Sequence, residues 1–338
     1  MMMPMSRVLV PLHISAELPP DGGAVHDFSG SSMGTGWSVK LAVDARQSVA
    51  HLRAGIQDRL DAVEREMSHW SPDSDLGRFN RAQAGNWHDL PDAFFEVLSY
   101  ALGVAEESGG AYDPAAGALL NLWGFGPDGR HDTPGFTLPS AEAVRVLAEN
   151  PGWRSIALDR ARRRLMQPGG VLLDLSAVAK GYAVDAVARY LERQGIRHYM
   201  VEVGGELRGA GMKPDGQPWW VVLEQPPGRE SEKVLLALHG LSVATSGDYG
   251  SYFRREDTIY PHTLDPRSGY PIRNDVASVT VVHENCMAAD ALSTVLTVLG
   301  LDEGLCFAEA RCLAARFLIR DGERLIEHMT SDFRALLQ

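Results

Sequence analysis

Two oxygen-bearing side chains stand four residues apart in a predicted helix that is otherwise almost entirely apolar. Asp290 and Thr294 follow the predicted helix start near Cys286, and their spacing places them on one helical face. Because burying a lone carboxylate costs several kcal/mol, Asp290 needs a partner. Both groups are hard oxygen ligands, so Mg²⁺ is one suitable partner. In the alternative interpretation, Asp290 meets an arginine or a helix N-terminus, while Thr294 bonds back to the carbonyl of Asp290.

The segment DLSAVAKGY, residues 174–182, provides a second candidate site. Asp174 follows a predicted strand, Lys180 lies just inside a predicted helix, and Gly181 permits close approach of another backbone. Helix starts expose N–H groups and the positive end of the helix dipole, which suit phosphate groups or ribose hydroxyls. An alternative is that Asp174 or Ser176 caps the helix and Lys180 is a solvated charge.

Three further segments could contribute, and each has a structural alternative. His262 precedes a strong turn signal and could carry a proton, although a lone histidine is more often structural. In VEVGGELRGAG, Glu206 follows paired glycines, which either allow a flat ligand to approach or form a bulge. No helix follows these glycines, unlike in a dinucleotide fingerprint. Met33 and Trp70 could contact a ligand, but most aromatic residues belong to the core.

The elements that must position these residues come in groups. Apolar residues at helical spacing predict helices over residues 47–69 and 91–107. A third helix is predicted to begin after Ser140, and a fourth to end at Gly195, which serves as its C-terminal cap. Residues 109–138 are expected to be irregular and ligand-facing. Strands are predicted over residues 37–43, 155–159, 163–167, 171–174, 198–203, 219–224, 233–238, 241–245, 258–263 and 276–282. A helix–strand–strand tail completes the chain. Runs of consecutive strands with helices between them predict an α+β fold.

The composition is that of an ordinary globular protein of 338 residues, 45% hydrophobic and 22% charged. Acidic residues outnumber basic ones by 44 to 32, and the net charge of −12 argues against nucleic acid or an anionic membrane as the main partner. The three cysteines form neither a disulfide framework nor a zinc-binding pattern.

The N-terminal region bears on location and domain organisation. No stretch reaches the roughly 18 apolar residues of a membrane span. The N-terminal residues have neither a signal-peptide core nor a lipid-accepting cysteine, so a cytoplasmic location is expected for the sequence as written. Residues 1–27 are predicted to be a poorly ordered lead-in, and residues 28–338 a single domain.

Eight ordered segments together resemble the ApbE family, the FAD:protein FMN transferases. They run from residue 28 to about residue 320 and read FSGSSMGTGWSVKL, MSHWSPDSDLGRFN, GGAYDPAAGALLNLWGFG, DLSAVAKGYAVD, VEVGGELRGAG, SVATSGDYGSYF, HTLDPRSGYP and MAADALSTVLTVLG. The resemblance implies an ApbE-like, T-fold-related α+β fold with mixed or antiparallel sheets and packed helices. It also implies two intimately associated lobes, with the FAD site in the cleft between them.

The activity that the resemblance implies is Mg²⁺-dependent transfer of FMN from FAD to a Thr or Ser hydroxyl of another protein, with release of AMP. By matching motifs, Asp290 and Thr294 would bind Mg²⁺ through their side chains, and Ala177 through its backbone carbonyl. Asp290 would thereby be catalytic, and His262 would act as the general base. The expected contacts to FAD are Met33, Trp70, Ala111, Tyr112, Asp113, Asp174, Lys180 and Leu264.

This sequence departs from the family pattern at two positions. Trp70 replaces a common tyrosine, which preserves stacking on the cofactor but removes a hydroxyl. Ser293 stands where some members carry another acidic or a small residue, which leaves one side-chain carboxylate for the metal.

Two alternative functions use the same site: an FAD pyrophosphatase that gives FMN and AMP, and a non-catalytic FAD carrier. The Asp290–Thr294 pair argues against a carrier, because binding FAD alone would not need a metal at the pyrophosphate. Acceptors of the family carry a D-x-x-[ST]-G-A-T type of stretch, which this chain lacks. The expected partner is therefore a separate acceptor flavoprotein.

Overall fold

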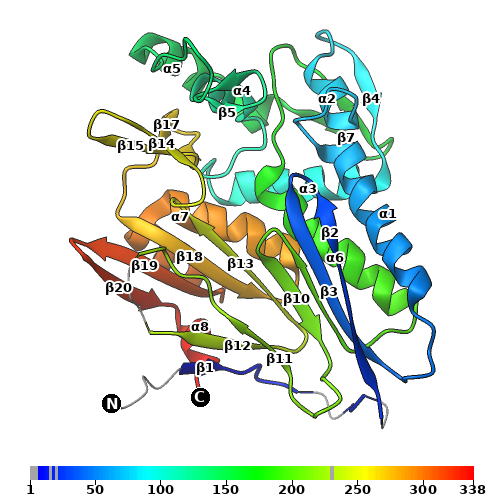
Figure 1. Cartoon of the computed structure of the whole chain (residues 1–338). Helices are drawn as coiled ribbons and strands as arrows, with labels where there is room; N and C mark the ends of the chain where they lie inside the picture. Colours follow the sequence, from blue (N-terminus) through cyan, green and yellow to red (C-terminus); the bar gives the residue numbers. More distant parts are fainter. Residues whose placement is uncertain (1–6, 15–16, 20–21, 229–231) are drawn as a thin grey trace. The chain divides into compact units, whose positions relative to one another are not determined.

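The computed structural model describes residues 7–14, 17–19, 22–228 and 232–338 (Figure 1). The chain divides into two units, of which unit 1 comprises Met1–Asp61, Lys180–Gly247 and Asp275–Gln338, and unit 2 comprises Ala62–Ala179 and Asp248–Asn274. Helices α1 (Ala50–Met67) and α6 (Ser176–Arg193) each begin in one unit and end in the other. The expected single domain over residues 28–338 stays a prediction.

Unit 1 is built on an eight-stranded sheet in which all neighbouring strands are antiparallel. In spatial order the strands are β2 (Ala24–Ser32), β3 (Thr35–Val43), β9 (Tyr199–Val203), β10 (Glu206–Ala210), β13 (Leu241–Gly247), β18 (Val276–His283), β19 (Ala314–Asp321) and β20 (Arg324–Met329). Helix α7 (Cys286–Glu309) packs on one face of this sheet, against β13, β18 and β19.

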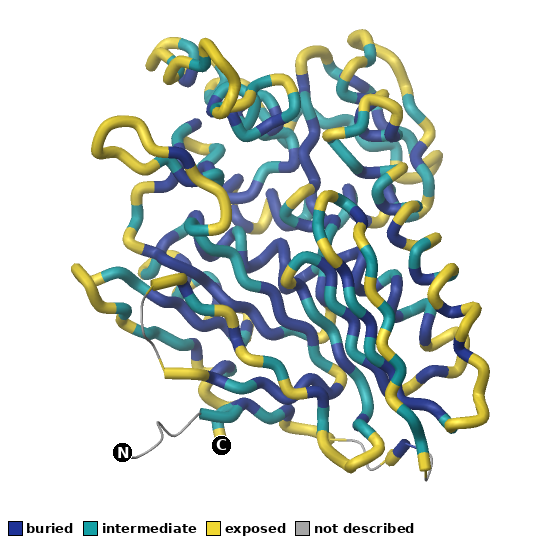
Figure 2. The backbone as a smooth tube through the Cα atoms, viewed as in Figure 1, coloured by how far each residue is buried: buried dark blue, intermediate teal, exposed yellow. Residues whose placement is uncertain are grey.

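The opposite face of the sheet carries a second layer. A three-stranded sheet of β1 (Arg7–Leu9), β12 (Val234–Leu238) and β11 (Trp219–Val222) packs there with α8 (Ser331–Ala335). Their core includes Leu236, Phe333 and, from the large sheet, Val243 and Val282. Because both of its faces are covered, β18 is buried along nearly its whole length, including the hydroxyl-bearing Ser278 and Thr280 (Figure 2).

Unit 2 combines short helices with small antiparallel sheets. The helices that lie wholly in it are α2 (Asp75–Asn80), α3 (Asp92–Glu107), α4 (Gly117–Leu122), α5 (Ala141–Ala148) and a 3₁₀ turn (Gly152–Ser155). The sheets are β4 (Trp87–Asp89) with β8 (Arg164–Met166) and β7 (Ala157–Asp159), β5 (Phe125–Gly126) with β6 (Gly129–Arg130), β14 (Tyr252–Arg255) with β15 (Thr258–Pro261), and β16 (Leu264–Asp265) with β17 (Tyr270–Pro271). A core of Leu119, Trp123, Val144, Phe253 and Leu264 joins α4 and α5 to the last two hairpins.

The α+β class predicted from the sequence is confirmed, and the local end signals of two helices are seen directly. Ser140 caps α5 by accepting the N–H of Ala143. Gly195, with φ of 78°, ends α6, and the N–H of the next residue, Ile196, returns to the carbonyl of Leu191. This is the Schellman arrangement that a glycine after a helix favours.

Three expectations differ from the structure. The segment at residues 109–138, expected to be irregular, contains α4 and the β5–β6 hairpin. The strand predicted over residues 171–174 is absent from the described part of the chain, apart from a single bridge at Leu172. The side chain of Asn80 instead forms hydrogen bonds with both the N–H and the carbonyl of Leu173, so these groups need no strand partner. Within the predicted lead-in of residues 1–27, β1 pairs with β12 and β2 begins at Ala24, while residues 1–6, 15–16 and 20–21 lie outside the described residues.

By length and hydropathy, α7 is the one helix in the described ranges that could cross a membrane. Its most apolar window is 56% buried inside the protein. Burial against a sheet is typical of a core helix, which can be apolar all round. Gly300, with φ of 78°, interrupts the helix and divides it into two stretches.

An ion-pair cluster that is partly exposed, apart from the buried Arg316, joins β1, β19 and β20 in unit 1. Arg316 on β19 is 2% exposed and pairs with Glu327 on β20, which also binds Arg7 on β1 at 2.6 Å. The hydrogen bond from Arg7 and the charge of Arg316 outweigh burial and lower the pKa of Glu327 below its ordinary value of 4.5. Glu327 therefore balances two guanidinium groups, one of them in the core.

We expect Glu327→Gln to reduce the free energy of unfolding by about 3 kcal/mol at pH 7, because it leaves the Arg316 charge buried without its counterion. A carboxyl with a lowered pKa stabilises the fold above its ordinary pKa, and this contribution disappears as the pH falls through the folded-state value. The difference between wild type and variant should therefore shrink below about pH 4.5. Urea titrations of wild type and variant at pH 7 and pH 4 measure this difference in the free energy of unfolding. Glu142→Gln, which disturbs only an exposed pair, should show no change.

Candidate functional site

The carboxylate of Asp290 is buried where α6 meets α7 in unit 1. Its Oδ2 atom accepts the backbone N–H of Gly181 at 2.9 Å, and the residue is 4% exposed. Within the described residues, Oδ1 accepts no hydrogen bond. Burial raises the pKa of Asp290, whereas the charge of Lys180 and the Gly181 N–H act in the opposite direction. The alternative interpretation expected an arginine or a helix N-terminus beside Asp290. The structure instead places the N–H of Gly181, inside α6, and the charge of Lys180 there.

Lys180 lies between two acidic side chains. Its ammonium group pairs with Glu206, which is 4% exposed at the start of β10, and it also feels the charge of Asp290. Burial disfavours its charged form, but the two carboxylates outweigh this and raise the pKa of Lys180. Burial, together with the charge of Asp290, raises the pKa of Glu206 to about 8, even though Lys180 opposes the shift. Lys180 is therefore not an isolated solvated charge: it is a partner within the cluster, although its side chain remains 34% exposed.

The hydroxyl groups beside Asp290 bond back to the helix. Ser293 Oγ donates to the Asp290 carbonyl at 2.8 Å, while Thr294 Oγ1 reaches the same carbonyl at the long distance of 3.5 Å. Ser293 is buried, whereas Thr294 is partly exposed. A weakly held, partly exposed Thr294 hydroxyl one turn from a buried carboxylate is compatible with both interpretations of the pair.

Close contact between α6 and α7 depends on Gly181. A Cβ atom at this position would lie 2.4 Å from the Cys286 carbonyl oxygen and 2.8 Å from Asp290 Cβ. We expect Gly181→Ala to separate the two helices and to cost about 1–3 kcal/mol of stability. Gly103→Ala in α3 is the matched control, because nothing lies within 4 Å of its added Cβ, and it should stabilise by about 0.5–1 kcal/mol. Thermal unfolding of both variants measures the contrast, and equal effects would contradict it.

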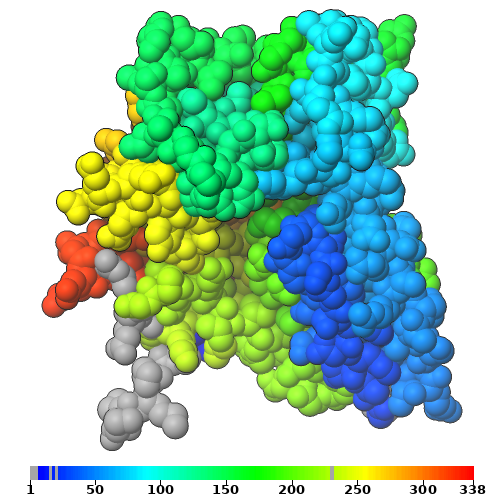
Figure 3. All heavy atoms as spheres, turned by 45° about the horizontal axis from the view of Figure 1, so that its top comes forward, coloured from blue at the N-terminus to red at the C-terminus, as the bar shows by residue number. Residues whose placement is uncertain are grey.

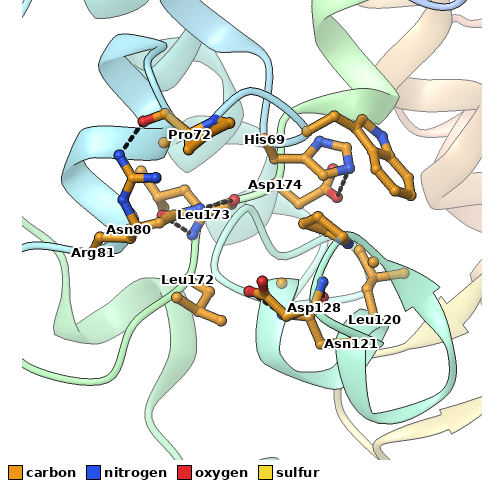
Figure 4. Close-up of a pocket in the computed structure, with 15 residues that line it drawn as sticks. His69, Pro72, Asn80, Arg81, Leu120, Asn121, Asp128, Leu172, Leu173 and Asp174 are labelled. Carbon is orange, nitrogen blue, oxygen red and sulfur yellow. Dashed lines mark hydrogen bonds and ion pairs between the residues drawn. The ribbon is translucent and has the colours of Figure 1, made fainter. Parts of the chain in front are cut away.

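In unit 2, Asp174 and Trp70 line the same cavity of about 300 Å³ (Figure 4). Asp174 Oδ1 accepts the N–H and hydroxyl of Ser176, and Oδ2 lies 3.5 Å from His69 Nε2. Asp174 therefore both supports the start of α6, as the alternative interpretation held, and faces the cavity. Figure 4 shows His69 directed toward Asp174.

The remaining cavity wall mixes polar and apolar groups. Trp70 is 50% exposed, unusual for so large an aromatic side chain, and its ring lies 5.8 Å from the Arg130 guanidinium. Asn80, Asn121 and Asp128 add amide and carboxylate groups. The segment predicted to be ligand-facing supplies Gly117, Leu120, Asn121, Gly126, Pro127 and Asp128 to this wall. A half-exposed ring beside polar groups suits a flat ligand with hydroxyls.

The other expected FAD contacts in unit 2 lie outside that cavity. Ala111 and Tyr112 are buried, and Leu264 belongs to the aromatic core. Asp113 accepts the N–H groups of Ala115 at 2.7 Å and Trp153 at 3.1 Å, and it borders a separate cavity of about 30 Å³. Burial raises the pKa of Asp113, although both hydrogen bonds oppose the shift.

His262 follows β15 in unit 2, and its ring orientation is held by the backbone. The Nδ1 atom lies 3.0 Å from the Ser251 carbonyl oxygen. A carbonyl oxygen only accepts hydrogen bonds, so Nδ1 carries the proton of the neutral ring and Nε2 is the basic nitrogen. This tautomer is the one that a general base acting through Nε2 requires.

Met33 occupies the tip of the β2–β3 hairpin in unit 1, which lies at the surface (blue in Figure 3). Ser32 pairs with Thr35, so Met33 and Gly34 form a two-residue loop in which both have positive φ, 52° and 72°. Loops of this kind favour asparagine or glycine, and a methionine there adopts a rarely populated conformation. Unfavourable backbone conformations of this type often occur at functional sites.

Five of the predicted residues form two groups. Lys180, Asp290 and Thr294 lie together in unit 1, whereas Trp70 and Asp174 share the unit 2 cavity. Ala177, with its intermediate exposure, lies in the first turn of α6 within unit 2. In the part of the chain that the structure describes, no three His, Cys, Asp or Glu side chains gather as for a metal. The expected ligand set contains only one such side chain.

Sequence reasoning missed several polar residues near these groups. His69 and Asn80 take part in the unit 2 cavity, and Asp185 and Arg208 form a partly buried ion pair beside the start of α7. His69 sits directly before Trp70, and Asp185 lies four residues after Gly181 on the same helical face. These spacings were visible in the sequence.

Comparison with known proteins defines the class. The model of the ApbE family matches residues 33–317. A FAD:protein FMN transferase of Klebsiella pneumoniae is 34% identical over 315 residues, which cover 92% of this chain and 89% of that relative. One from Haemophilus influenzae is 35% identical over 325 residues, covering 93% and 92%. The apo crystal structure of Pseudomonas stutzeri flavinyl transferase ApbE is similar with a TM-score of 0.85 at 37% identity, covering 93% of this chain and 97% of that one.

The α+β fold is therefore that of the flavin transferases. This chain belongs to the ApbE family, as the ordered motifs predicted.

Proposed function

We propose that this protein is an enzyme that transfers FMN from FAD to a hydroxyl group of an acceptor protein and releases AMP. The observation that carries the proposal is the buried Asp290 carboxylate, with Lys180 beside it, in a chain that belongs to the ApbE family over residues 33–317. The relatives from Klebsiella and Haemophilus are both named FAD:protein FMN transferase. Binding FAD alone would not need a cation at the pyrophosphate, which argues against an FAD carrier.

The residues present fit a bound Mg²⁺ ion. Asp290 holds Gly181 through Oδ2, which leaves Oδ1 for a cation, and the Thr294 hydroxyl is only weakly engaged. Oxygen ligands of this kind suit Mg²⁺. We propose that Asp290, Thr294 and the backbone carbonyl of Ala177 hold the ion. Ala177 is included only because it matches the family motif. When bound, Mg²⁺ would neutralise charge on the pyrophosphate of FAD.

Other residues would bind and orient the donor. Trp70 offers a half-exposed ring for stacking, and Asp174 and its neighbours offer hydrogen-bonding groups in the same cavity. Lys180 is about a third exposed and could meet the anionic part of FAD. Met33, Ala111, Tyr112, Asp113 and Leu264 are proposed contacts on the basis of matching motifs.

The transfer step needs a base, because a neutral hydroxyl is a poor nucleophile. We propose that His262 Nε2 takes the proton as the acceptor oxygen forms its bond to the phosphorus of the FMN moiety. The bond from this phosphorus to the oxygen of the AMP phosphate breaks in the same reaction, and AMP leaves. The hydrogen bond from Nδ1 to Ser251 keeps the ring in the required tautomer.

Incubating the purified protein with FAD, Mg²⁺ and a fragment bearing a D-x-x-[ST]-G-A-T stretch tests the proposal. We expect flavin fluorescence that remains on the fragment after denaturation, and we expect AMP in solution. Free FMN and AMP without labelling would indicate the hydrolase instead. Retained, unchanged FAD would indicate the carrier.

A further inference from the structure

The first turn of α7 is capped by a side chain from α6. Asn285 stands at the N-cap position, but its side chain makes no capping hydrogen bond. Asp185 Oδ2 instead accepts the N–H of Met287 at 3.0 Å. Helix starts leave N–H groups unpaired, and a carboxylate there is also favoured by the helix dipole. Asp185 therefore anchors the beginning of the helix that carries Asp290.

The second oxygen of Asp185 is held from the sheet. Arg208 on β10 donates to Oδ1 at 2.6 Å, and its other terminal nitrogen lies 3.5 Å from Glu192. The Asp185 side chain is 3% exposed, whereas Glu192 is 44% exposed. The Arg208 contact restricts the orientation of the carboxylate, so Asp185 cannot rotate away from Met287 without breaking a partly buried ion pair, in which the Arg208 side chain is 21% exposed.

Asp185 and Gly181 connect the same two helices one turn apart. They are four residues apart on α6, and their partners Met287 and Asp290 are three residues apart on α7, so each pair shares a helical face. One bond runs from α6 to α7, from the Gly181 N–H to Asp290. The other runs from α7 to α6, from the Met287 N–H to Asp185. Neither rotation nor sliding of α7 preserves both bonds.

We infer that Asp185 is a positioning residue that, with Arg208, sets the place of the Asp290 carboxylate for a divalent cation. The inference rests on the proposed function, because it takes Asp290 to be a cation ligand. Groups that orient a ligand from the second layer typically change metal affinity by about 10- to 100-fold when they are lost. A purely structural cap would instead affect the stability of the fold and leave the affinity of the folded protein unchanged.

Cation binding can be measured without catalysis. Mn²⁺ alone is titrated into the full-length protein, and free Mn²⁺ is followed by its electron paramagnetic resonance signal while circular dichroism reports the folded fraction. For Asp185→Asn, which preserves size but removes the charge that pairs with Arg208, we expect the Kd for Mn²⁺ to rise about tenfold. Glu192→Gln is the matched control at the exposed end of the network, and its Kd should equal that of wild type.

The outcomes separate this inference from the proposed function. If Asp290→Asn binds Mn²⁺ as tightly as wild type, the cation assignment itself is wrong. If Asp290→Asn loses binding but folded Asp185→Asn stays within twofold of wild type, the positioning role is wrong. Should Asp185→Asn fail to fold, Arg208→Lys preserves the charge and loosens the geometry. It should also weaken Mn²⁺ binding, and an unchanged Kd for Arg208→Lys would overturn the inference.

Discussion

Asp290→Asn is expected to lower the rate of FMN transfer by about a thousandfold or more, because it removes the one side-chain carboxylate of the proposed cation site. Asparagine preserves the size of the side chain, and its carbonyl oxygen can still accept the Gly181 N–H. Burial raises the pKa of Asp290, so folding should tolerate a neutral side chain there. The loss should therefore appear in turnover, which AMP release measures, and in cation binding. The melting temperature should not change.

A control for this variant lies on the same helix. Asp302 is exposed, so Asp302→Asn should transfer FMN at the wild-type rate. Full activity of Asp290→Asn, or equal losses in the two variants, would show that the Asp290 carboxylate does not hold the cation.

His262→Ala is expected to reduce the rate of transfer by about 10²–10⁴-fold while leaving the affinity for FAD almost unchanged. The reason is that the hydroxyl of the acceptor would lose the base that takes its proton. Added imidazole should restore part of the activity, because it can supply a basic nitrogen in the vacated space. Stopped assays of flavin attachment with and without imidazole measure both effects.

The control for the histidine is His51→Ala, because His51 is exposed on α1. It should behave as wild type in both assays. Transfer by His262→Ala at the wild-type rate would show that His262 is not the base. A loss of activity that matches a loss of FAD affinity would assign His262 to binding or structure.

Local signals in the sequence predicted much of the fold. The alternation and apolar runs of β3, β9, β13 and β18 marked the strands of the main sheet, and Gly195 marked the end of α6. Each of these signals acts over a few residues, and the surrounding structure did not override it. The family resemblance then supplied the identity of the fold, which periodicity alone could not.

The features that were missed depend on residues far apart in the chain. The segment at residues 171–174 has the composition of a strand, but Asn80 satisfies the backbone of Leu173 from more than ninety residues away. Asp290 finds its partner in the N–H of Gly181, which no residue-type pattern announces. The sequence suggested that Asp290 needs a partner, but only tertiary packing identified it.

Transfer of FMN from FAD to a protein hydroxyl fixes the molar ratio of the two products. The protein is incubated with FAD, Mg²⁺ and an acceptor fragment. AMP is quantified by chromatography, and flavin on the denatured fragment is quantified by intact-mass spectrometry. We expect one covalently bound FMN for each AMP released, and no label when the acceptor Thr or Ser is replaced by alanine. AMP matched by free FMN, with the fragment unlabelled, would contradict it.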